Sequence, residues 1–261
     1  MDNNIFSAFF LTLTAGLATG IGSIIALFAK KTNKRFLSAA LGFSAGVMLY
    51  ISFVEMLDQS KNYLTTGFGI YKGTWFCLFS FLSGMLIIML IDNLLPSPES
   101  KLTAVKSGKE QARLHRTGML MTLAIAIHNF PEGLATFTAA LDSLSLGAAI
   151  AIAIAIHNIP EGIVTSVPIY YATGNKKKAF CMSFISGITE PLGAIVGYAL
   201  LHPFLNDTLY GIIFGIISGI MVYISIEELI PMAREYDKGN SMIFGSIAGM
   251  TVMAISLILF M

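Results

Sequence analysis

Charged residues are scarce in this chain: Asp, Glu, Lys and Arg make up 12% of its 261 residues, whereas hydrophobic residues make up 55%. A soluble domain usually has about a quarter of its residues charged. The few charges fall in clumps between apolar runs of about 20 residues, the length that crosses a hydrocarbon core ~30 Å thick. The composition excludes soluble enzymes and nucleic-acid-binding proteins. It predicts an all-α integral membrane protein whose surroundings are the lipid bilayer.

Sequence motifs of other function classes are also absent. The chain has two cysteines, Cys77 and Cys181, which lie in apolar runs without CxxC spacing. The sequence therefore indicates neither a disulfide framework nor a thiolate metal site. It contains no G-x-x-x-x-G-K-[ST] stretch, so we expect no nucleotide-driven step, and no HExxH zinc-hydrolase helix.

Eight apolar runs are long enough to span a membrane as helices. They lie near residues 6–29, 37–57, 74–95, 118–139, 145–170, 180–200, 209–230 and 242–260. The one long connection, residues 96–117, is polar and contains Pro96 and Pro98. We predict that it is a flexible cytoplasmic loop and that the whole chain is one transmembrane domain.

The basic residues indicate the orientation of these spans. The first, third, fifth and seventh connections hold 14 of the 16 Lys and Arg residues, and only Lys61 and Lys72 remain for the opposite side. Basic residues accumulate in cytoplasmic connections. We therefore expect these four connections in the cytoplasm and both termini outside it.

The sequence also contains internal repeats. Segment 123–136, LAIAIHNFPEGLAT, matches segment 152–165, IAIAIHNIPEGIVT, at 10 of 14 positions, in consecutive spans of opposite direction. A weaker similarity relates VMLYISFVEML at 47–57 to IMVYISIEELI at 220–230. Together they predict a 3+2+3 inverted-repeat bundle, an arrangement typical of transporters with a site near the bilayer midplane.

Acidic residues within the predicted spans have no basic counterpart. These spans contain no Lys or Arg but seven carboxylates: Glu55, Asp92, Glu132, Glu161, Glu190, Glu227 and Glu228. Ionisable groups in a membrane normally face a water-filled cavity or a partner. Three of the seven lie well inside their spans, away from the interfaces: Glu132, Glu161 and Glu190. Protons or a bound cation must supply the missing positive charge.

The repeated motif favours a metal ion over protons alone. On a helix, residues four apart share a face, so His128 lies with Glu132 and His157 with Glu161, and Asn129 and Asn158 lie beside these faces. Imidazole and carboxylate together suit Zn²⁺, Fe²⁺ or Mn²⁺, and amide oxygens add a harder site.

Pro131 and Pro160 each remove a backbone N–H beside the His-Asn pair, so we expect a helix break there. Irregular backbone at membrane depth is tolerated where it lines a cavity or is buried in protein. Gly133 and Gly162, which follow in the motif, predict a close approach of neighbouring helices.

The motifs HNFPEG at 128–133, HNIPEG at 157–162 and ITEPLG at 188–193 resemble the ZIP (Zrt/Irt-like) divalent-metal transporters, most closely their bacterial ZupT group. The resemblance covers the whole chain. It implies eight spans, outward termini and a 3+2+3 inverted arrangement, as the residue patterns also indicate. It further implies a homodimer.

The resemblance also implies a centre for two metal ions. Glu132 and Glu161 would bridge both ions, and His157 with His128 would complete a zinc-preferring site. Asn129, Asn158 and Glu190 would complete a second site that accepts Fe²⁺. The family often has His-Glu-Leu in span seven where this chain has Glu227-Glu228-Leu229, which puts the metal selectivity in question.

These observations predict a secondary transporter, not an enzyme, that takes up Zn²⁺ and related ions such as Fe²⁺, Mn²⁺ and Co²⁺ into the cytoplasm. The transported metal ion is the only small-molecule partner expected. One alternative is a proton-driven carrier or channel for another cation, which an absence of affinity for these metals would favour. A second is an intramembrane zinc hydrolase, in which histidine ligands hold a metal-activated water and a glutamate acts as base.

Overall fold

The computed structural model describes residues 2–28, 34–94, 107–204, 206–237 and 239–260, and every element in these ranges is helical. The helices in chain order are α1 (Asp2–Phe28), α2 (Lys34–Ile51), η1 (Ser52–Met56), α3 (Leu57–Phe68), α4 (Ile70–Leu94), α5 (Ser107–Asp142), α6 (Leu144–Thr173), α7 (Lys176–Leu201), η2 (His202–Phe204), α8 (Asp207–Ile224), η3 (Ser225–Leu229), α9 (Ile230–Tyr236) and α10 (Ser241–Phe260). The predicted all-α class is confirmed.

Seven helical stretches among the described residues are long and apolar enough to cross a membrane: Asn4–Phe28, Lys34–Phe68, Ile70–Ile91, Leu144–Val167, Lys176–Leu200, Asp207–Tyr236 and Ser241–Leu259. They coincide with seven of the eight predicted spans. The remaining prediction, 118–139, lies within α5, which has the necessary length of 36 residues but is not among the seven.

Two predicted connections contain more helix than expected. Residues 107–117, predicted as loop, form the first turns of α5, whereas 95–106 lie outside the described residues. The second span continues through η1 into α3, so that Lys34–Phe68 is a stretch of 35 residues, or about 50 Å at 1.5 Å per residue. That length exceeds a ~30 Å hydrocarbon core, so we expect part of the stretch to extend beyond the membrane.

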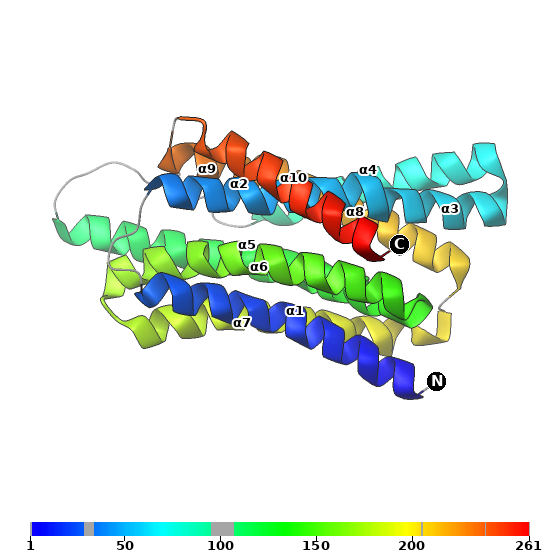
Figure 1. The fold of residues 1–261 in the computed structure, drawn as a ribbon, viewed down its shortest axis with the longest axis horizontal. Helices are drawn as coiled ribbons and strands as arrows, with labels where there is room; N and C mark the ends of the chain where they lie inside the picture. Colours follow the sequence, from blue (N-terminus) through cyan, green and yellow to red (C-terminus); the bar gives the residue numbers. More distant parts are fainter. Residues whose placement is uncertain (1, 29–33, 95–106, 205, 238, 261) are drawn as a thin grey trace.

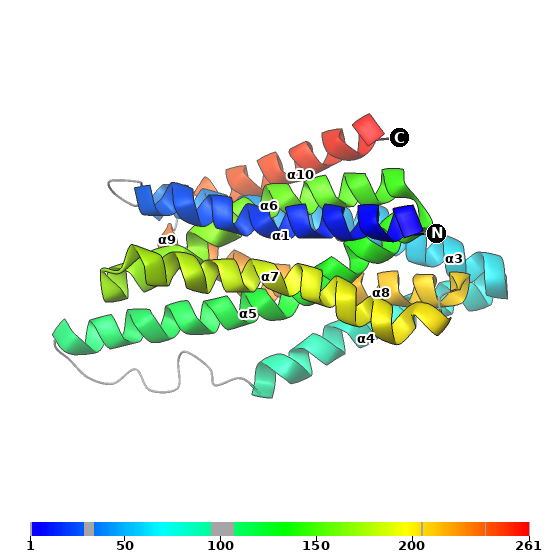
Figure 2. The same ribbon diagram turned by 90° about the horizontal axis from the view of Figure 1, so that it is seen from below.

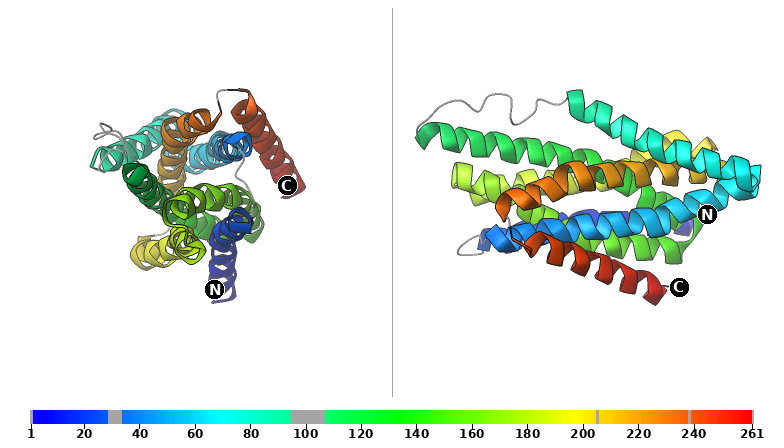
Figure 3. Two further views of the ribbon diagram at one scale, coloured as in Figure 1. Left: turned by 90° about the vertical axis from the view of Figure 1, so that its left-hand side faces the viewer. Right: turned by 90° about the horizontal axis from the view of Figure 1, so that it is seen from above.

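The helices form two groups, which lie one above the other in Figure 1 and are seen end-on in the left view of Figure 3. In the first group, α1, α5, α6 and α7 contact one another, and Figure 2 shows them running lengthwise together. In the second group, α2 packs on α10, and α4 packs on α8. The groups meet mainly where α2 contacts α6 and where α5 contacts α8.

Glycines set the spacing inside the second group. A Cβ added to Gly46 of α2 would lie 2.2 Å from the carbonyl oxygen of Ser246 on α10, and one added to Gly249 of α10 would lie 2.2 Å from that of Phe43. Real Cβ atoms do not approach oxygen so closely, so only glycine allows these backbones to meet. Helices α2 and α10 therefore form a tight pair at these glycines.

The weaker sequence repeat has a structural counterpart. Both of its segments contain a π-helical turn, η1 and η3, at matching positions. The hydroxyl of Ser52 donates to the Met48 carbonyl (2.6 Å), and that of Ser225 donates to the Met221 carbonyl (2.7 Å). The two segments therefore share local geometry as well as sequence.

Large apolar side chains cover the outside of the bundle. Trp75 and Phe79 of α4 and Phe244 and Leu259 of α10 are each more than half exposed. Such a surface is unfavourable in water and suits lipid contact. The fold is that of a multi-pass membrane protein.

Candidate metal centre

The two copies of the HNxPEG motif lie on α5 and α6, which pack against each other. Both helices continue through their prolines, so the predicted break at Pro131 and Pro160 is wrong. Prolines are tolerated in membrane helices where neighbouring helices pack closely. Here a Cβ on Gly133 would lie 2.0 Å from the Glu190 carbonyl oxygen, so α7 packs closely on α5 at this point. The predicted close approach at the motif glycines is confirmed.

Two backbone carbonyls on neighbouring helices hold the motif asparagines. Asn129 Nδ2 donates to the Ser186 carbonyl on α7 (3.1 Å), and Asn158 Nδ2 donates to the Ala15 carbonyl on α1 (2.9 Å). Both side chains are fully buried. Since each amide nitrogen is fixed to a neighbouring helix, the amide oxygen is free to serve as an acceptor on the inside of the group.

The predicted carboxylates are also fully buried. His157 Nε2 lies 3.4 Å from both carboxylate oxygens of Glu132, which links α6 to α5. Glu190 Oε1 accepts a hydrogen bond from Asn158 Nδ2, which links α7 to α6. The carboxylate of Glu190 is also close enough to those of Glu132 and Glu161 to interact with them electrostatically. The structure thus gathers residues from three predicted spans.

Glu161 has a partner that the sequence did not indicate. Ser44 of α2 donates from its hydroxyl to Glu161 Oε1 (3.1 Å), and both side chains are fully buried. Ser44 belongs to the second helix group, so this hydrogen bond joins the groups at the site. A serine in an apolar span is too common for sequence reasoning to single it out.

No described basic side chain balances these buried acids, because every described Lys and Arg side chain is exposed. Three of the buried oxygens at this site also have no hydrogen-bond partner among the described residues: Asn129 Oδ1, Asn158 Oδ1 and Glu190 Oε2. Burying carboxylates and acceptors without compensation costs several kcal/mol. A cation between them would satisfy both the charge and the acceptors.

The ligand set remains a prediction. The backbone of α5 at His128 is described, but its side chain lies outside the described part of the structure. Among the described side chains, no three His, Cys, Asp or Glu residues lie close enough together to hold a metal ion. The predicted ligand set also includes the amide oxygens of two asparagines, which are not among these four residue types. The geometry therefore shows a concentration of potential ligands around α1, α5, α6 and α7, not a closed coordination sphere.

The other described carboxylates of the spans are less buried than this cluster. Glu55 in η1 is half-buried and accepts a hydrogen bond from Gln59 Nε2 (3.1 Å). In η3, Glu227 is exposed and Glu228 is half-buried. The side chain of Asp92 is not among those described.

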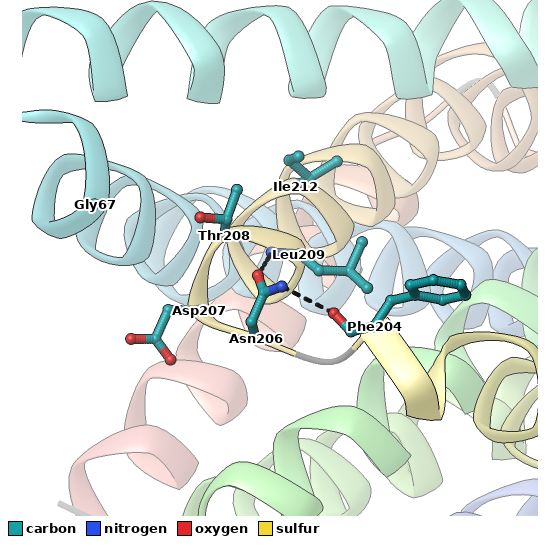
Figure 4. A pocket seen from close by; sticks show the side chains of 7 residues that line it. All are labelled: Gly67, Phe204, Asn206, Asp207, Thr208, Leu209 and Ile212. Carbon is teal, nitrogen blue, oxygen red and sulfur yellow. Dashed lines mark hydrogen bonds between the residues drawn. The ribbon is translucent and has the colours of Figure 1, made fainter.

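An open cleft between the end of α3 and the start of α8 contains none of the predicted ligands (Figure 4). Its lining residues are Gly67, Phe204, Asn206, Asp207, Thr208, Leu209 and Ile212. The Asn206 side chain accepts from the Leu209 N–H (3.0 Å) and donates to the Phe204 carbonyl (3.0 Å). It therefore caps α8, so its polar atoms serve local structure.

Known proteins similar to this chain give an independent comparison. The family model described as "ZIP Zinc transporter" matches residues 95–257. The zinc transporter ZupT of Clostridium perfringens (strain 13 / Type A) is 54% identical, over 99% of this chain and 97% of its own length. The zinc transporters ZupT of Streptococcus mutans and Lysinibacillus sphaericus are each 52% identical, over 99% or more of both chains. The similarity extends over the full length and is not confined to the paired motif.

Proposed function

This chain belongs to the ZIP family of zinc transporters, and on that basis we propose that it carries Zn²⁺ across the membrane into the cytoplasm. The resemblance seen in the sequence and the prediction that the protein is not an enzyme are thereby confirmed. An intramembrane hydrolase is no longer a candidate.

One observation carries the proposal: three carboxylates, two amide oxygens and an imidazole are buried together with no described basic residue among them. In this proposal Glu132 and Glu161 bridge two metal ions. His157 and His128 complete the site preferred by Zn²⁺. Asn129, Asn158 and Glu190 complete a second, oxygen-rich metal site beside it. Such an oxygen-rich site suits Fe²⁺, Mn²⁺ or Co²⁺ as further substrates.

The two helix groups suggest how the ion passes. The proposed ligands all lie in the group of α1, α5, α6 and α7, whereas Ser44 reaches them from the other group. Movement of one group against the other would break the Ser44–Glu161 hydrogen bond and expose the ligands to one side at a time. Alternating access of this kind is typical of transporters built from inverted repeats.

The proposed orientation in the membrane follows from the charges at the helix ends. Lys34 at the start of α2 and Lys176–Lys178 at the start of α7 lie at the end of the bundle opposite the start of α1 and the end of α10 (Figure 1). With the basic end in the cytoplasm, both termini face outward. Homodimer formation stays a prediction that light scattering on the purified protein tests.

Zinc uptake into proteoliposomes tests the proposal. We expect Glu161→Ala to reduce the rate by roughly 100-fold or more, because loss of a bridging ligand disturbs both ions. Glu235→Ala, at an exposed position on α9, is the matched control and should keep the normal rate. Normal uptake by Glu161→Ala would refute the site. If calorimetry shows no affinity of the normal protein for Zn²⁺, Fe²⁺ or Mn²⁺, a carrier or channel for another cation is the better description.

A further inference from the structure

Helices α1 and α7 meet at a reciprocal contact. A Cβ on Gly16 would lie 2.4 Å from the Gly187 carbonyl oxygen, and a Cβ on Gly187 would lie 2.4 Å from the Gly16 carbonyl oxygen. Residues 15–22 and 186–193 also carry glycine at the same two places, second and last. The contact therefore relates the two segments residue by residue, in agreement with an inverted repeat.

This relation makes Thr19 of α1 the counterpart of Glu190 of α7. A Cβ on Gly162 would lie 1.9 Å from the Thr19 carbonyl oxygen, and a Cβ on Gly133 would lie 2.0 Å from that of Glu190. The backbone of each residue therefore lies against the glycine of one copy of the motif. The Glu190 side chain reaches across to Asn158 of the other copy. By the same relation we expect the Thr19 side chain to face Asn129.

The Thr19 hydroxyl is fully buried and has no hydrogen-bond partner among the described residues. A threonine inside a helix commonly donates to the carbonyl four residues back, as Thr12 does to Ala8 on the same helix (3.0 Å). The carbonyl four residues before Thr19 is that of Ala15, which already accepts from Asn158 Nδ2. The usual partner of this hydroxyl is therefore engaged by a motif asparagine.

The position of the hydroxyl agrees with the repeat. A Cβ on Gly187 would lie 3.0 Å from Thr19 Oγ1, so the hydroxyl is against α7 beside Ser186. The Ser186 carbonyl in turn accepts from Asn129 Nδ2. From this geometry we infer that Thr19 also belongs to the metal centre. Its hydroxyl contributes a neutral oxygen beside Asn129, as Glu190 contributes a carboxylate beside Asn158.

This inference, which rests on the proposed function, has a consequence for selectivity. One flank of the centre carries a carboxylate and the other a hydroxyl, so the two flanks differ in charge although their backbones match. Neutral oxygen favours the harder, more oxygen-coordinated ions and adds little for Zn²⁺, which prefers nitrogen and sulfur. The Thr19 hydroxyl therefore strengthens binding of Mn²⁺ and Fe²⁺ more than binding of Zn²⁺.

Uptake of Mn²⁺ and Zn²⁺ by Thr19→Val, which keeps the shape but removes the hydroxyl, tests the inference. We expect the KM for Mn²⁺ to rise about five-fold, the effect of losing roughly one hydrogen bond's worth of interaction. The KM for Zn²⁺ should rise no more than about two-fold. Thr19→Ser, which restores the hydroxyl, should return the KM for Mn²⁺ to near its normal value.

Ser23→Ala is the matched control: Ser23 is also a buried α1 hydroxyl without a described partner, but its repeat counterpart is the apolar Ala194. Its KM values should stay normal. Equal effects of Thr19→Val and Ser23→Ala, or equal effects on both metals, would overturn the inference. Glu161→Ala in the same assay separates the two proposals: if it is inactive and Thr19→Val is normal, only the role of Thr19 fails.

Discussion

The two helix groups use the same packing device around different interiors. Both bring helices together through glycines that lie against a neighbouring carbonyl, as at Gly162 in the first group and Gly46 in the second. The interior of the first group holds buried carboxylates, amides and an imidazole, whereas the second buries mainly apolar side chains such as Leu41, Met48 and Phe214. Tight packing is therefore common to both groups, and the buried charges of one group need a separate explanation, which the transported cation of our proposal would supply.

The largest expected effect separates these interiors. We expect Glu132→Ala to reduce zinc uptake by roughly 100-fold or more, since it removes a ligand and leaves His157 without its carboxylate. Met48→Leu, a volume-conserving change in the buried apolar interior of the second group, should leave the rate per folded protein within about two-fold. A rate for Met48→Leu as low as that of Glu132→Ala would show that the two interiors do not differ in function.

A second prediction concerns what the groups share. Gly162→Ala would place a Cβ 1.9 Å from the Thr19 carbonyl oxygen, and Gly46→Ala one 2.2 Å from that of Ser246. We expect each change to destabilise the protein by about 1–3 kcal/mol, because backbone must move away. Thermal unfolding followed by fluorescence-detected size exclusion measures the loss.

Gly67→Ala on α3 is the control for these two variants, because its Cβ would meet the nearest atom, Thr208 Oγ1, at an ordinary 3.6 Å. It should be neutral or slightly stabilising, since alanine favours a helix by up to about 1 kcal/mol over glycine. If Gly162→Ala were as stable as Gly67→Ala, the close approach of α1 and α6 would be wrong.

The sequence predicted those features that the membrane itself requires. Apolar length located the spans, and a motif repeated with His, Asn, Pro, Glu and Gly at fixed offsets located the buried polar residues. It did not predict the continuity of α5 through Pro131, the contact of Ser44 with Glu161, or the carbonyl partner of Asn129. Each of these depends on which helix lies alongside, and a single sequence read by local pattern contains no direct record of that.

The pH dependence of binding should also distinguish the two groups. Metal ligands must be deprotonated, so lowering the pH from 7.5 to 5.5, across the ordinary titration range of imidazole, should weaken zinc binding by roughly ten-fold. The apolar interior of the second group offers no comparable protonation. Calorimetric titration at both pH values, with circular dichroism to confirm that the helices persist, measures the effect. Equal affinity at the two pH values would argue against imidazole as a ligand.

The smallest expected effect lies outside both interiors, at the π turn η3. Glu227 is exposed there, in the place where the ZIP resemblance often has histidine. Glu227→His should therefore leave the maximal uptake rate nearly unchanged and shift the ratio of Zn²⁺ to Mn²⁺ uptake toward zinc by about two-fold to three-fold, because imidazole suits Zn²⁺ better than carboxylate does. Competition uptake with both metals measures the ratio. A complete loss of transport would instead place Glu227 within the essential path and make η3 part of the functional site.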